Sequence, residues 1–244
     1  MIYVVRYLLI ALYTVFWGTV GILVGLVDRS GEGILWVGRR WIDWVLATCG
    51  IEIRAEGLGD LDARDPYVLM SNHQSVFDVA AIIASWPGSF RFVAKRELTW
   101  VPFFGWALAL GGHVIIDRSR RERAVKSLEA AARQVRDGTT VIIFPEGTRS
   151  PSGGMGEFKS GGFHLALQAG VPILPVSVSG SRRITPKRSL RIESGPILIR
   201  YGRPIPTAGR GIDERQALKD QVRAAIQAGF DADLQRETDP VRAA

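Results

Sequence analysis

The chain has 244 residues, 47% of them hydrophobic, and its 31 Lys and Arg residues against 24 Asp and Glu residues give a net charge of +7. This length supports one substantial α/β core rather than two full domains. The single cysteine, Cys49, excludes an intramolecular disulfide and a multi-cysteine zinc site. His73, His113 and His164 are isolated from one another in sequence, so we expect no metal site.

The N-terminal region is unusually apolar. Residues 7–27 carry no charge, whereas a bilayer crossing needs about 20 apolar residues. This run is too long for a signal peptide and is followed by no clear small-residue cleavage site, so it favours membrane attachment over cleavage or a buried core helix. The excess positive charge suits nucleic acid or an anionic membrane. Because no zinc-finger spacing or aromatic RNA-binding signature occurs, we expect a membrane partner and no nucleic acid.

A second apolar segment, residues 34–46, contains three tryptophans and two arginines among aliphatic residues, a composition typical of the headgroup region. We therefore predict that residues 1–49 form a membrane-anchoring helical hairpin that dips into one leaflet, with a full crossing as the alternative. Gly21 and Gly25 form a small-xxx-small pair that would let the two helices approach closely.

After the hairpin, short β-branched runs alternate with helical stretches, which predicts an α/β sheet domain over residues 50–230 and a polar tail over 231–244. The expected strands cover residues 51–55, 67–70, 91–94, 113–117, 140–144, 173–179, 190–193 and 197–201. The expected helices cover residues 78–86, 121–136, 161–169 and 214–228. Residues 194–196, Ser-Gly-Pro, are expected to turn a hairpin between the last two strands.

His73 and Asp78 stand five residues apart, directly after the expected strand 67–70. On one helix this spacing would turn the two side chains about 140° apart, so they can meet only across a turn. Ser75 and Asp78 form a capping box that would start a helix there. His73 would then lie on the loop, with Asp78 ionised in the first helical turn and able to orient the imidazole. The alternative is that Asp78 only caps the helix.

Residues 140–150 predict a buried strand that ends in a Pro-Glu-Gly turn and an arginine. In α/β sheets, ligands bind at the carboxyl ends of strands. Arg149 could present its guanidinium to a phosphate, together with the loop amides of Gly147 and Thr148. An ordinary strand-exit turn with a solvated arginine is the alternative.

Two further basic residues follow expected strands. Lys95 precedes the aromatic stretch 100–106, and this pairing suits an amphiphile with a charged head and an acyl tail. Arg118 follows the strand at 113–117. Taken alone, Lys95 could equally be solvated and the aromatic residues could belong to the core.

Together these segments resemble the ordered motifs of the glycerolipid acyltransferases, most closely the bacterial 1-acyl-sn-glycerol-3-phosphate acyltransferases. Asn72-His73-Gln74-Ser75-Val76-Phe77-Asp78 matches the H-x4-D motif, and residues 144–150, Phe-Pro-Glu-Gly-Thr-Arg-Ser, match the E-G-T-R motif. Residues 94–98, 116–118 and 171–175 match further blocks in the same order. The resemblance implies a mixed β-sheet flanked by helices.

The resemblance also implies an activity: transfer of a fatty acyl group from acyl-CoA or acyl-carrier protein to the sn-2 hydroxyl of 1-acyl-glycerol-3-phosphate, giving phosphatidic acid. His73 would act as the general base on this hydroxyl and Asp78 would orient it. Neither an enzyme-bound acyl intermediate nor a cofactor beyond the acyl donor is expected. The implied location is the cytoplasmic side of the inner membrane.

The remaining candidate residues would bind substrate. Arg149, Lys95 and, more weakly, Arg118 carry over as phosphate ligands, whereas Glu146 would shape its turn and position Arg149. Gly147 and Thr148 would contribute loop amides. Another lysophospholipid or a lyso-aminolipid remains an alternative acceptor. A serine hydrolase would need a G-x-S-x-G elbow, which this sequence lacks, and a catalytically silent membrane-binding protein would leave the polar motifs without a purpose.

Overall fold

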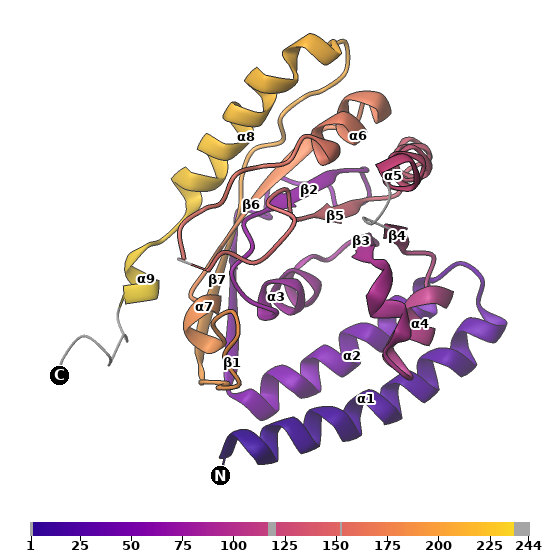
Figure 1. Cartoon of the computed structure of the whole chain (residues 1–244), viewed down its shortest axis with the longest axis vertical. Helices are drawn as coiled ribbons and strands as arrows, with labels where there is room; N and C mark the ends of the chain where they lie inside the picture. Colours follow the sequence, from indigo (N-terminus) through magenta and orange to yellow (C-terminus); the bar gives the residue numbers. More distant parts are fainter. Residues whose placement is uncertain (1, 117–120, 152, 237–244) are drawn as a thin grey trace.

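The computed structural model describes residues 2–116, 121–151 and 153–236 (Figure 1). Its strands are β1 (Ile51–Glu56), β2 (Val68–Ser71), β3 (Arg91–Lys95), β4 (Val114–Ile116), β5 (Val141–Ile143), β6 (Ile173–Ser179) and β7 (Gly195–Tyr201). Its helices are α1 (Ile2–Val27), α2 (Glu32–Cys49), α3 (Phe77–Ser85), η1 (Arg96–Trp100), α4 (Phe104–Leu110), α5 (Arg121–Arg136), α6 (Gly161–Ala169), α7 (Ser181–Ile184), η2 (Ile212–Glu214), α8 (Arg215–Gly229) and α9 (Asp233–Arg236).

The strands form one mixed sheet in the order β1-β7-β6-β2-β5-β3-β4, which confirms the predicted fold class. β2, β3, β4, β5 and β6 run parallel to one another, whereas β7 is antiparallel to β6 and parallel to β1. The carboxyl ends of the five parallel strands therefore lie at one edge of the sheet. In parallel α/β sheets this edge is where ligands bind.

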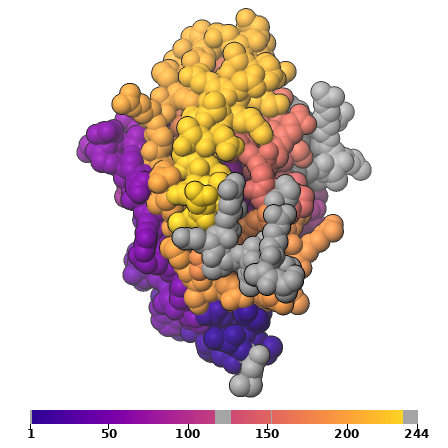
Figure 2. Space-filling model, turned by 90° about the vertical axis from the view of Figure 1, so that its left-hand side faces the viewer, coloured from indigo at the N-terminus to yellow at the C-terminus, as the bar shows by residue number. Residues whose placement is uncertain are grey.

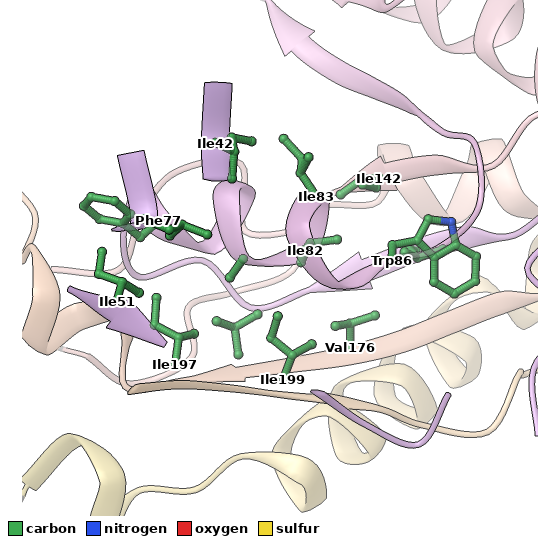
Figure 3. Close-up of a cluster of buried hydrophobic side chains, with 14 of the residues drawn as sticks. Ile42, Ile51, Phe77, Ile82, Ile83, Trp86, Ile142, Val176, Ile197 and Ile199 are labelled. Carbon is green, nitrogen blue, oxygen red and sulfur yellow. The ribbon is translucent and has the colours of Figure 1, made fainter. Parts of the chain in front are cut away.

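Helices cover both faces of the sheet, because the central strands alternate their side chains between two hydrophobic clusters. Leu69 of β2 belongs to the cluster under α2 and α3, whereas Met70 belongs to the cluster under α5, α6 and α8. Figure 3 shows α3 between α2, which carries Ile42, and the sheet, which carries Val176 and Ile199. Full burial of a side chain of this size contributes about 1.5–3 kcal/mol.

The predicted N-terminal hairpin is present as α1 and α2, which pack against each other below the sheet in Figure 1. Among the described residues, α1 is the one helix long and apolar enough to cross a membrane, and only 11% of its most apolar window is buried. Its first turns are nevertheless tied to the α/β domain. The buried Arg6 guanidinium donates to the Ile192 carbonyl oxygen and to Ser194 Oγ, the latter at 2.7 Å.

Glycines on α1 permit close packing, but against two helices rather than one. A Cβ on Gly25 would lie 2.6 Å from Ile34 of α2 and 3.0 Å from Leu110 of α4. A Cβ on Gly21 would lie 3.2 Å from the side chain of Ala107 in α4, and one on Gly18 would lie 2.6 Å from that of Phe103. The predicted close approach of α1 to α2 is thus confirmed at Gly25. The glycines at positions 18, 21 and 25 also let α4 and the residue before it pack closely on α1.

Two predictions about the last third of the chain are wrong, and most of the predicted polar tail, residues 237–244, lies outside the described residues. Residues 190–193 form no strand, because the Glu193 amide donates to the Ile184 carbonyl oxygen instead of to a neighbouring strand. The hairpin at 194–196 is also absent, since β7 pairs with β1 and β6. The tail is ordered at its start: α9 follows Asp231, whose amide donates to Ser179 Oγ at 2.9 Å. Figure 2 shows α8 in yellow in the upper part of the molecule and the N-terminal helix in indigo at the bottom.

Candidate active site

His73 and Asp78 meet at the carboxyl end of β2, where the chain turns into α3. His73 Nδ1 lies 2.9 Å from Asp78 Oδ2, and Asp78 is fully buried. The same carboxylate oxygen accepts the backbone N–H groups of Gln74 at 2.6 Å and Ser75 at 2.8 Å. Because the carboxylate holds Nδ1, the other ring nitrogen, Nε2, remains for an external proton. The predicted pairing across a turn is confirmed.

Ser75 forms only half of the predicted capping box. The Asp78 carboxylate accepts the Ser75 amide, but Ser75 Oγ accepts the N–H of Phe77 at 3.3 Å and not that of Asp78. The hydroxyl instead donates to the carbonyl oxygen of Thr185 at 2.9 Å. Ser75 is fully buried, and its hydrogen bond to Thr185 joins the His73 loop to the segment that follows α7.

Glu146 connects the E-G-T-R loop to the His73 loop. Its Oε1 accepts the backbone N–H of His73, and its Oε2 accepts that of Gly156, each at 2.8 Å. Its side chain is buried, and this burial raises the pKa of its carboxyl group. Both carboxylate oxygens accept backbone N–H groups, which favours the predicted structural role of Glu146. The residue that it holds directly is His73, however, and not Arg149.

Two further contacts fix His73 in place. The Ser150 amide donates to the His73 carbonyl oxygen at 2.7 Å, so the E-G-T-R loop holds both backbone groups of the histidine. The imidazole stacks on the Phe144 ring, with centroids 4.2 Å apart. Neither contact can be read from the motif spacing, because it depends on β5 lying beside β2.

The loop after Glu146 turns back at Gly147, whose φ of +71° favours glycine. The Gly147 amide donates to the Phe144 carbonyl oxygen at 3.0 Å, so this turn already uses the amide that we expected to face substrate. Lys187 Nζ donates to Thr148 Oγ1 at 3.2 Å and to the Arg149 carbonyl oxygen at 2.7 Å. Lys187 was not among the predicted site residues, because nothing in its local sequence places it beside the E-G-T-R loop.

Arg149 and Lys95 supply positive charge at the same edge of the sheet. Arg149 is half-buried, and its guanidinium has no hydrogen-bond partner among the residues that the structure describes. Lys95 ends β3, next to β5, and its amine lies 2.9 Å from Glu97 in an exposed ion pair. Such pairs contribute about 0–1 kcal/mol, so an anionic ligand can compete for Lys95. Arg118, the third predicted ligand, lies outside the described residues.

This edge combines a buried carboxylate, an oriented imidazole and two cations. The groups come from neighbouring strands: His73 follows β2, Arg149 follows β5 and Lys95 ends β3. An imidazole held in this way can take a proton from a hydroxyl group, and nearby cations can hold an anionic substrate. Within the described residues, no group of three or more His, Cys, Asp or Glu side chains is placed to hold a metal ion.

Comparisons with known proteins agree with this geometry. A family model described as Acyltransferase matches residues 52–179. The 1-acyl-sn-glycerol-3-phosphate acyltransferase alpha of Homo sapiens is 38% identical over 182 residues, covering 74% of this chain and 64% of the human protein. The chain thus spans slightly less than two thirds of that relative. A 1-acyl-sn-glycerol-3-phosphate acyltransferase of Pseudomonas aeruginosa is 33% identical over 213 residues, covering 85% of this chain and 82% of the relative.

A solved structure extends the likeness to the whole fold. The crystal structure of the 1-acyl-sn-glycerophosphate (LPA) acyltransferase from Thermotoga maritima is similar with a TM-score of 0.80 and 26% identity, covering 93% of this chain and 92% of that chain. The family match includes both loops that form the site described above. The chain therefore belongs to the acyltransferase family that its motifs predicted, whose members include 1-acyl-sn-glycerol-3-phosphate acyltransferases.

Proposed function

We propose that this chain transfers a fatty acyl group from acyl-CoA or acyl-carrier protein to the sn-2 hydroxyl of 1-acyl-glycerol-3-phosphate, which yields phosphatidic acid. One observation carries this proposal: His73, whose imidazole is fixed by buried Asp78, follows β2, and β2 is the neighbour of β5, the strand that leads to Arg149. A base and a cation so arranged suit an acceptor with a hydroxyl near a phosphate. The names of the relatives reported above state this class of acceptor.

In the proposed reaction, His73 Nε2 takes the proton of the acceptor hydroxyl as its oxygen attacks the thioester carbonyl carbon. Asp78 stabilises the imidazolium that forms. The C–S bond then breaks, and the departing thiolate takes the proton back from His73. Because the nucleophile belongs to the substrate, no acyl-enzyme intermediate and no cofactor beyond the donor are needed.

Arg149 and Lys95 are the proposed phosphate ligands, and Glu146 with Lys187 positions the loop that carries Arg149. The α1–α2 hairpin is the proposed anchor, lying in one leaflet of the inner membrane with the catalytic domain on its cytoplasmic side. A dip suits the contacts better than a crossing, because α1 touches the α/β domain at Arg6 near its start and at Gly25 near its end. A crossing helix would pull the parts of the α/β domain that contact both of its ends, including the polar partners of Arg6, into hydrocarbon.

The direct test is product formation. Membranes that contain the protein are incubated with lysophosphatidic acid and either labelled acyl-CoA or labelled acyl-carrier protein, and we expect labelled phosphatidic acid with at least one donor. Absence of product with both donors, from protein whose fold is verified by circular dichroism, would contradict the proposal and favour a silent membrane-binding protein. Product only with a phosphate-free or amino-lipid acceptor would favour the alternative acceptors.

We expect Arg149→Ala to raise the KM for lysophosphatidic acid about 10- to 100-fold, because a charge-assisted contact to phosphate contributes about 1.5–3 kcal/mol. Initial rates are measured against acceptor concentration, for lysophosphatidic acid and for the phosphate-free monoacylglycerol.

The matched control is Arg203→Ala, which removes the same charge from an exposed arginine after β7, at the opposite edge of the sheet. It should leave the KM unchanged. An equal loss on both acceptors in Arg149→Ala would remove the phosphate-ligand assignment.

A further inference from the structure

A patch of large apolar side chains is exposed on η1 and α4, outside the predicted anchor. It consists of Leu98, Trp100, Val101, Trp106 and Leu110, and we call it the η1–α4 patch. Trp100 is 68% exposed and Trp106 is 50% exposed. Single exposed apolar residues are ordinary, but five within one short segment, two of them tryptophans, mark an interaction surface.

This patch adjoins the exposed apolar side of α1. α4 packs along the second half of α1, where Gly18, Gly21 and Gly25 admit it, and the two helices lie side by side in Figure 1. α1 itself exposes Phe16, Leu23 and other large apolar residues on this half. The η1–α4 patch and the exposed apolar residues of α1 therefore lie on two helical segments that pack against each other, from two separate parts of the sequence.

We propose that the η1–α4 patch is a second lipid-contacting surface, which enters the same leaflet as α1. This inference rests on the proposed membrane attachment of α1. A bilayer is the occupant that fits, because it would cover α1 and its adjoining patch together. Tryptophan side chains favour the boundary between headgroups and hydrocarbon. Exposed Lys95 and Arg96 at the start of η1 add positive charge at the rim, where anionic headgroups lie.

The location of the patch has a consequence for the proposed site. Lys95 ends β3 at the catalytic edge and immediately precedes η1. Lipid contact by η1 would therefore hold Lys95 at the level of the headgroups. The phosphate of a lysophosphatidic acid in the same leaflet lies at this level, so the acceptor reaches Lys95 without leaving the membrane.

The chain offers a clean labelling experiment, because its single cysteine, Cys49, is fully buried. Single cysteines replace Trp100 or Trp106, and each full-length variant carries an environment-sensitive bimane label. Two reference variants are used for comparison. Leu12→Cys lies on the exposed side of α1, and Ile212→Cys is an exposed position on η2, which contacts α8. α8 lies across the sheet from α1 (Figure 1). The proteins are mixed with phosphatidylcholine–phosphatidylglycerol vesicles with and without doxyl-labelled lipids.

We expect labels at positions 100 and 106 to shift to shorter emission wavelength on vesicles and to be quenched by the doxyl lipids, as the label at position 12 is. The label at position 212 should change little. If position 12 responds and positions 100 and 106 behave like 212, the η1–α4 inference fails while the α1 anchor stands. If position 12 also fails to respond, the proposed anchor itself is wrong. A wavelength shift without doxyl quenching would indicate protein association and overturn the lipid assignment.

Discussion

Asp78→Asn is expected to lower kcat by about two to four orders of magnitude with little change in the KM for lysophosphatidic acid. The asparagine oxygen can still accept the amides of Gln74 and Ser75, so the turn should persist. The negative charge beside His73 Nδ1 is lost, however, and with it the stabilisation of the imidazolium in the transition state. In a serine protease, the equivalent substitution reduces kcat about 10⁴-fold. Steady-state kinetics with acyl-CoA measures both constants.

Three control variants accompany this prediction. His73→Ala should lose activity to a similar extent, because base and partner act as one unit. Cys49→Ser and Ser75→Ala should both remain active, since direct transfer needs no enzyme nucleophile. Mass spectrometry of the wild-type protein incubated with donor alone provides a separate check. An acyl adduct on the protein would overturn direct transfer.

Glu146→Ala should be the most destabilising change at the site. It leaves the partly buried amides of His73 and Gly156 without their acceptor. A fully buried unsatisfied group costs about 1–3 kcal/mol, so each of these amides should cost no more than this. We also expect at least a tenfold fall in kcat, because the backbone of His73 loses its support. Urea unfolding gives the stability change, and kcat is measured where the variant remains folded.

The control for this change is Glu157→Ala, which removes an almost fully exposed carboxylate from the same connecting segment. It should alter neither stability nor kcat. If Glu146→Ala abolished activity without loss of stability, the carboxylate would take part in the chemistry and the positioning role would be wrong.

The sequence predicted much of the sheet, because its central strands are short β-branched runs buried on both faces. Val141 to Ile143 is one such run, and β6 matched its predicted range throughout. Residues 190–193 failed for a physical reason: the alternation of Leu190 and Ile192 imitates a strand, yet Leu190 is exposed and Ile192 packs inside a loop held by Arg6. η1 and α4 were missed because Pro102 and Gly105 interrupt their aromatic pattern.

The site was predictable where it is local. His73 and Asp78 are close in sequence, and the Asp78 carboxylate accepts the amides of the turn between them. The contacts of Glu146 with the His73 amide and of Lys187 with the Arg149 carbonyl join residues far apart in the chain. They follow from β2 lying between β5 and β6, an order that hydrophobic patterning does not specify.

This strand order also separates two events during synthesis of the chain. α1 and α2 are complete at Cys49, but the neighbours of β2 begin only at Val141 and Ile173. Domains form from the N-terminus as the chain emerges, and pairings between distant segments form last. The proposed anchor is therefore finished long before the loop after β2 gains its supports. A nascent chain would be attached to its membrane while still inert, and it would begin to consume acyl donor only when nearly all of it has left the ribosome.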